Sequence, residues 1–103
     1  GQLELALAQL EQIIERDALN GDALIELANC YAEQGDMAKA INRYQQAEKM
    51  ETFQRKALIA QAQARVRQND YLAALPLLRR ALQIEFDQQL ADFTQRVQRA
   101  AKN

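Results

Sequence analysis

The sequence contains a repeat with a period of 34 residues. The stretch AEQGDMAKAINRYQQAEKME at 32–51 is followed 34 positions later by VRQNDYLAALPLLRRALQIE at 66–85. Residues 21–54 align without a gap to residues 55–88 with ten identities, most of them at apolar or turn positions. The identical pairs are Ala23/Ala57, Leu24/Leu58, Ile25/Ile59, Ala28/Ala62, Gln34/Gln68, Asp36/Asp70, Ala40/Ala74, Ala47/Ala81, Glu51/Glu85 and Gln54/Gln88. A fixed period of this length predicts a solenoid, in which each unit covers the apolar face that its neighbour cannot bury alone.

Within each unit the apolar residues recur at helical spacing. The first unit carries them at i, i+3, i+4 and i+7, on Leu24, Leu27, Ala28 and Tyr31. The pattern breaks at EQGDM, where Gly35 can adopt the left-handed conformation that ends a helix and Asp36 can cap the next one. The second unit repeats this turn with Asn69 and Asp70. Each unit is therefore predicted to be two antiparallel helices joined by a tight turn.

Small residues recur at the same period and mark the predicted close approaches of the helices. These positions hold Ala28, Ala40, Ala47, Ala62, Ala74 and Ala81. The larger Tyr31, Tyr44, Leu58 and Leu78 are expected to fill the wider gaps between them. An alternation of small and large side chains is how paired helices interlock.

The composition excludes several classes of function. The chain has 103 residues, of which 49% are apolar and 26% charged, an ordinary balance for one small globular domain. There is no histidine, and Cys30 is the single cysteine, so we expect no metal site, no haem ligation and no internal disulfide. No Gly-rich phosphate loop and no nucleophile–base pair is evident. We therefore expect no enzymatic activity and no cofactor.

Neither a membrane span nor a signal peptide is evident. No run of about 18 apolar residues occurs, and the start GQLELALAQL has no basic region before an apolar core. We expect a domain that folds in water, with cytoplasm and periplasm both open as its compartment.

The charges are distributed unevenly along the chain. Residues 1–36 contain one basic residue and eight acidic ones, a net charge of −7, whereas residues 37–103 contain twelve basic and six acidic residues, a net charge of +6. Solvated helix faces that differ in charge explain this; attraction of an acidic partner, or a head-to-tail contact between copies, is the alternative. No basic stretch is dense or interleaved with aromatic residues, so we do not expect nucleic-acid binding.

Taken together, these residues resemble the tetratricopeptide repeat family. Its 34-residue unit has a large residue, Leu, a small residue and Tyr in the first helix, a Gly-Asp type turn, and a small, an aromatic and a small residue in the second. The first unit matches with Leu24, Leu27, Ala28, Tyr31, Gly35, Asp36, Ala40, Tyr44 and Ala47. In the second unit Gln61, Arg65 and Asn69 replace the usual Leu, Tyr and Gly. Thr52 and Phe86 stand where the family has its closing Pro.

The resemblance implies an all-α fold, a right-handed α-solenoid of antiparallel helix pairs with about six helices. We expect one domain over residues 1–103, cut from a longer protein. Its predicted parts are the second helix of a truncated repeat (1–20), two full repeats (21–54 and 55–88) and a capping helix (89–103).

The two ends are expected to differ. The N-terminal helix, expected over Leu3–Glu15, carries the apolar residues Leu3, Leu7, Leu10 and Ile14. Because the preceding helix of its pair is missing, we expect part of this face to be uncovered and to form a homo-oligomer. In the C-terminal helix the positions for packing against the preceding pair hold Asp92, Gln95, Arg96 and Arg99, and the apolar stripe is instead Leu90, Phe93, Val97, Ala100 and Ala101. A helix with one apolar and one polar face is typical of the end of a solenoid.

The resemblance also implies a concave groove lined by the first helix of each pair. The candidate peptide-binding residues are Asp22, Ile25, Asn29 and Glu33 in the first repeat and Lys56, Ile59, Gln63 and Arg67 in the second. Ile25 and Ile59 are expected to accept an apolar side chain, and the amides of Asn29 and Gln63 to hydrogen-bond a peptide backbone. The alternative is a solvated face with two incidental isoleucines.

One ligand mode of the family is not expected. Family members that hold the C-terminal carboxylate of heat-shock chaperones use a Lys, two Asn, a Lys and an Arg. Here only Asn29 matches; the other four positions hold Ile25, Ala60, Leu90 and Thr94.

The predicted function is that of a protein–protein interaction scaffold, which binds a peptide or helix of a partner in its concave groove. The alternative is a structural spacer or self-association module of a larger protein with no groove ligand. Binding of RNA by helical repeats is disfavoured, because Asp22 and Glu33 place acids in the groove.

Overall fold

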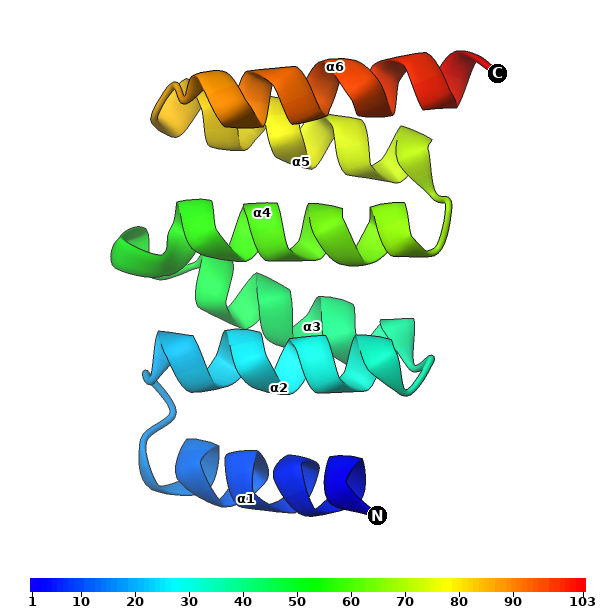
Figure 1. The fold of residues 1–103 in the computed structure, drawn as a ribbon. Helices are drawn as coiled ribbons and strands as arrows, with labels where there is room; N and C mark the ends of the chain where they lie inside the picture. The colour runs from blue at the N-terminus through cyan, green and yellow to red at the C-terminus, as the bar shows by residue number, and fades with distance from the viewer.

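The computed structural model describes all 103 residues and contains six α-helices and no β-strand. The helices are α1 (Gln2–Arg16), α2 (Gly21–Glu33), α3 (Met37–Glu48), α4 (Glu51–Arg67), α5 (Tyr71–Ile84) and α6 (Gln88–Lys102). They run alternately in opposite directions and stack from α1 at one end to α6 at the other (Figure 1). Each helix contacts the next, and α2 also contacts α4 directly. The predicted all-α solenoid of antiparallel helix pairs is confirmed.

The turns inside the two pairs form as the sequence predicts. Gly35 has a positive φ of 88° and Asn69 a positive φ of 63°, so asparagine takes the left-handed conformation where the first repeat has glycine. The carboxylate of Asp36 then accepts a hydrogen bond from the backbone N–H of Lys39 (3.2 Å). Asp70 caps α5 in the same way and also pairs with Arg65 at 3.2 Å. Both second helices therefore begin at an aspartate cap.

The fourth helix, α4, starts earlier than its repeat position predicts. In the first repeat Asn20 caps α2 by accepting a hydrogen bond from the backbone N–H of Ala23 (3.0 Å). Gln54 occupies the equivalent position 34 residues later, and its longer side chain favours a helix interior over a cap. The helix therefore begins upstream at Glu51, after Met50. This added turn brings further side chains onto the face that α4 shares with α2.

Small and large residues interlock as predicted. All six periodic alanines are completely buried, as are Tyr44, Leu58 and Leu78, and Tyr31 is half-buried. The buried apolar side chains form two groups, one joining α1 to α4 and one shared by α4, α5 and α6. Helix α4 contributes to both groups, with Ala57, Ala60 and Ala64 in the first and Leu58 and Ala62 in the second. Helix α4 therefore lies between the two groups and links them.

At the two ends the apolar faces are covered to different degrees. In α1 the residues Leu10 and Ile14 are buried in the first apolar group, and Leu7 packs against it. The large apolar side chains that α1 leaves exposed are instead Leu5 and Ile13. In α6, Leu90 and Val97 are buried in the second group. Its predicted polar face, formed by Asp92, Gln95, Arg96 and Arg99, is exposed.

Candidate functional site

The eight candidate groove residues lie on two adjacent helices. Asp22, Ile25, Asn29 and Glu33 belong to α2, and Lys56, Ile59, Gln63 and Arg67 belong to α4. In Figure 1 α4 lies above α2, and α6 lies above both. A surface made by α2 and α4 therefore spans two successive repeats.

Five of the eight residues line one open hollow with a cavity volume of about 440 Å³. We call this hollow the α2–α4 groove; its lining residues are Ile25, Asn29, Thr52, Arg55, Lys56, Ile59, Ala60 and Gln63. Glu33 and Arg67, at the C-terminal ends of their helices, do not line it. Asp22 does not line it either, but its carboxylate pairs with the ammonium of Lys56 at 2.6 Å. This exposed ion pair joins the two helices at one end of the groove.

The two isoleucines contribute unequally to the groove. Ile25 is only 4% exposed and belongs to the apolar core, so it offers little surface to a ligand. Ile59 is half-buried and packs against the second core group. The apolar surface that a partner can reach in the groove is therefore chiefly that of Ile59.

The amide of Asn29 is held in place by a tyrosine of the neighbouring second helix. The hydroxyl of Tyr44 in α3 donates a hydrogen bond to Oδ1 of Asn29. Tyr44 is completely buried, so its hydroxyl needs this acceptor. With its oxygen engaged, Asn29 keeps its NH₂ group as the donor that can serve a ligand. Gln63, one turn after Ile59 on α4, is exposed and carries a second amide.

A tetratricopeptide repeat model matches residues 1–54, which is more than half of the chain. The chain belongs to the tetratricopeptide repeat family. The match covers α1, α2, α3 and the first turn of α4. A comparison with curated proteins finds no match. Tetratricopeptide repeats are in general protein–protein interaction modules and non-enzymatic scaffolds.

Three residues of the groove were not predicted from the tetratricopeptide pattern. Thr52 reaches it from the added first turn of α4, Arg55 from the first position of the second repeat, and Ala60 lies beside Ile59. The guanidinium of Arg55 is directed to the end of α5, where Nε donates to the carbonyl oxygens of Ala81 (3.3 Å) and Glu85 (3.2 Å). The unsuitability of Gln54 as a cap was the one sequence signal that could have located Thr52 in a helix.

A charged network ties the tetratricopeptide repeats together on the other side of α2. The hydroxyl of Tyr31 donates to Oε1 of Glu11, and Nη2 of Arg43 lies 3.2 Å from Oε2 of the same carboxylate. These residues come from α2, α1 and α3. The hydrogen bond to Glu11, with burial, raises the pKa of Tyr31 because the neutral phenol is the donor. The network is structural, since each of its charged groups already has a partner.

Other reactive groups are sparse. No cluster of three His, Cys, Asp or Glu side chains that could hold a metal ion is present. Burial, together with Glu33 and Glu26, raises the pKa of the half-buried Cys30 thiol and so disfavours its reactive thiolate. None of the six helices has the length and apolar character required to cross a membrane.

Alkaline pH is expected to destabilise the fold through Tyr44. Burial raises the pKa of its phenol to about 12, against about 10 in an unfolded chain. The contribution of the buried, neutral Tyr44 phenol to the free energy of unfolding is therefore fully present below pH 10 and is lost as the pH rises towards 12. The expected loss at pH 11 is about 1 kcal/mol. Urea unfolding at pH 8, 10 and 11 measures it; a Tyr44→Phe variant that loses as much stability as the parent would show that other groups are responsible.

Proposed function

We propose that the protein is an interaction scaffold that holds a peptide segment of a partner protein in the α2–α4 groove. The observation that carries the proposal is the convergence of residues from two successive repeats, Ile25, Asn29, Lys56, Ile59 and Gln63, on one open hollow. Membership in a family of protein-interaction modules supports the same function.

The lining of the groove favours a segment with one apolar side chain and an accessible backbone. Ile59 provides the apolar contact, and the amides of Asn29 and Gln63, which line the same hollow, are available to peptide groups. Asn29 can donate to a peptide carbonyl through its NH₂ group, and Gln63 can both donate to a carbonyl and accept from an N–H. Of the two cations that line the groove, Lys56 is paired with Asp22, and Nε of Arg55 donates to backbone carbonyls without a carboxylate partner. A neutral or mildly acidic segment therefore fits better than a highly charged one.

Selection from a displayed random-peptide library tests the proposal. The parent protein is expected to enrich peptides that share an apolar residue, and Ile59→Lys and Gln63→Glu are each expected to weaken their binding at least tenfold. Ile25 is unsuitable for this test because lysine at a 4% exposed position would disturb the core. Leu72→Lys is the matched control, since Leu72 is 73% exposed on α5 and outside the groove.

The same experiment distinguishes the alternative. If no peptide is enriched, or if the groove variants bind as the parent does, the groove has no ligand. The repeats would then serve as a structural spacer or as a self-association module of a larger protein.

A further inference from the structure

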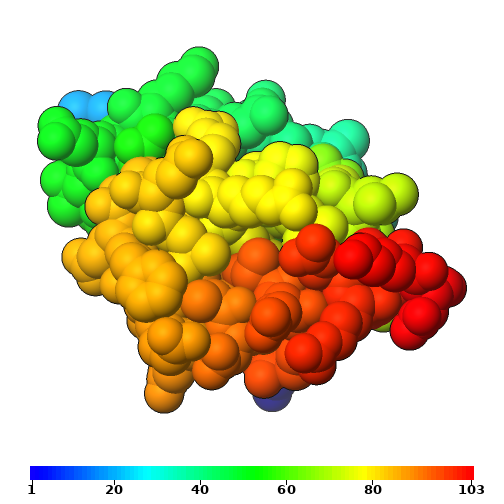
Figure 2. All heavy atoms as spheres, turned by 90° about the horizontal axis from the view of Figure 1, so that it is seen from above, coloured from blue at the N-terminus to red at the C-terminus, as the bar shows by residue number.

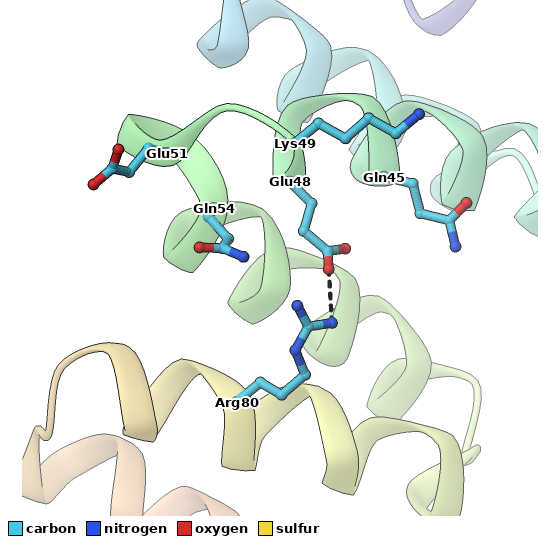
Figure 3. A pocket seen from close by; sticks show the side chains of 6 residues that line it. All are labelled: Gln45, Glu48, Lys49, Glu51, Gln54 and Arg80. Carbon is cyan, nitrogen blue, oxygen red and sulfur yellow. Dashed lines mark hydrogen bonds and ion pairs between the residues drawn. The ribbon is translucent and has the colours of Figure 1, made fainter.

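A polar hollow lies between α3 and α5, which are the second helices of the two full repeats. It is lined by Gln45, Glu48, Lys49, Glu51, Gln54 and Arg80, none of them apolar, and has a cavity volume of about 480 Å³. Figure 3 shows the carboxylate of Glu48 on α3 directed to the guanidinium of Arg80 on α5; they pair at 2.8 Å. Packing of consecutive repeats at this position therefore requires no apolar lining.

One repeat earlier, the hollow at the same place has a partly apolar lining, with four hydrophobic residues among seven. It is lined by Ile14, Ala18, Leu19, Arg43, Gln46, Lys49 and Met50 and has a cavity volume of about 460 Å³. Ile14 and Gln46 stand 34 residues before Glu48 and Arg80, so the two hollows are related by the repeat. We call this one the N-terminal hollow. Leu19, in the α1–α2 loop, lines this hollow and is 74% exposed to solvent.

Two cations border the N-terminal hollow. Arg43 pairs with Glu11, but the ammonium of Lys49 forms no ion pair. An apolar side chain that enters the hollow with a carboxylate beside it would therefore meet both an apolar lining and an unpaired positive charge. The surface suits an acidic segment with an exposed aromatic or aliphatic residue.

The chain itself contains such a segment at its other end. Residues 84–87, at the α5–α6 connection, read Ile-Glu-Phe-Asp, and Phe86 is 66% exposed. Ile84 is also an exposed large apolar residue, and the carboxylate of Glu85 forms no ion pair. Figure 2, which looks onto the α6 end, shows this part of the chain (orange) uncovered at the left margin of the end face. We call it the Phe86 segment.

The two surfaces are placed so that one copy can follow another. The α1–α2 and α5–α6 connections lie on the same edge of the stack, one near each end (Figure 1). A second copy displaced along the stack therefore presents its Phe86 segment to the N-terminal hollow of the first without being turned over. The net charges of −7 on residues 1–36 and +6 on residues 37–103 attract the opposite ends of two copies. The local pair of Lys49 and Glu85 adds a separate attraction, because both residues belong to the positive part.

We propose that copies of this chain associate head to tail, with Phe86 of one copy in the N-terminal hollow of the next and its Glu85 beside Lys49. Two copies joined in this way leave one hollow and one Phe86 segment free, so a third copy can add to the pair. A contact of this kind builds open chains or rings, not closed dimers. The proposal is independent of any ligand in the α2–α4 groove.

Sedimentation velocity over a series of protein concentrations tests the contact. The average mass is expected to rise beyond that of a dimer as concentration increases, and to fall when salt is added. Phe86→Ser and Leu19→Ser are each expected to leave the protein monomeric over the same series. Leu72→Ser is the matched control: it removes an equally exposed leucine away from both surfaces and is expected to associate as the parent does. Circular dichroism checks that the variants keep their helices.

Charge exchange tests the pairing of the two surfaces. Lys49→Glu and Glu85→Lys are each expected to weaken association several-fold, and the double variant to recover it. A parent that stays monomeric, or an association that stops at the dimer, would overturn the proposal. So would an association that survives Phe86→Ser but is lost in a Leu5→Ser/Ile13→Ser variant, because the exposed residues of α1 would then form the contact.

Discussion

Replacing Ala40 or Ala74 with leucine is expected to lower the free energy of unfolding by about 1–3 kcal/mol. Both side chains are completely buried in second helices, Ala40 in the core group that joins α1 to α4 and Ala74 in the group that α4, α5 and α6 share. The three added carbon atoms have no space unless neighbouring helices separate. For a chain of this length each kcal/mol lowers the melting temperature by about 4–8 °C.

Thermal unfolding followed by circular dichroism measures the effect. Ala38→Leu is the control, because Ala38 lies on the same helix as Ala40 but is exposed. We expect the free energy of unfolding of this variant to lie within about 0.5 kcal/mol of the parent's. If Ala40→Leu and Ala74→Leu also had the melting temperature of the parent, the alanines would not mark close helix contacts.

These alanines also show why most of the fold could be predicted. A single alanine is uninformative, but the same residue at a period of 34 is required wherever two helices meet at the same distance in each repeat. The turns were predictable for a similar reason, since Gly35 and Asn69 stand at equivalent positions and both residues tolerate a positive φ. The start of α4 was not predicted, because Gln54 stands where Asn20 caps α2 and the helix starts upstream at Glu51.

The candidate site was predicted less completely than the fold. The repeat register places Asn29, Ile59 and Gln63 on facing helices, and they do line one hollow. The register does not determine how deeply a side chain is buried, so it did not distinguish Ile25 in the core from Ile59 at the surface. It also could not reveal the N-terminal hollow, which is formed by side chains from a loop and two helices that are adjacent only in the folded chain.

The second repeat departs from the family pattern at Gln61, and this departure is expected to cost stability. Gln61 lies on α4 at the position of Leu27 in the first repeat, which is completely buried. The glutamine is itself only 4% exposed, and its Oε1 is buried without a hydrogen-bond partner. Gln61→Leu removes this unsatisfied acceptor and buries apolar atoms of similar volume in its place. We expect it to raise the free energy of unfolding by about 1–3 kcal/mol.

Urea unfolding of Gln61→Leu beside Gln63→Leu measures this gain against a matched substitution. Gln63 lies two residues away on α4 and is exposed, so its replacement is expected to change stability by no more than about 0.5 kcal/mol. A rise confined to Gln61→Leu would mean that the second repeat keeps a buried polar group at the expense of its own stability. Equal or lower stability of Gln61→Leu would contradict this, because the amide must then be hydrogen-bonded, to water or to a neighbouring side chain, in the folded protein.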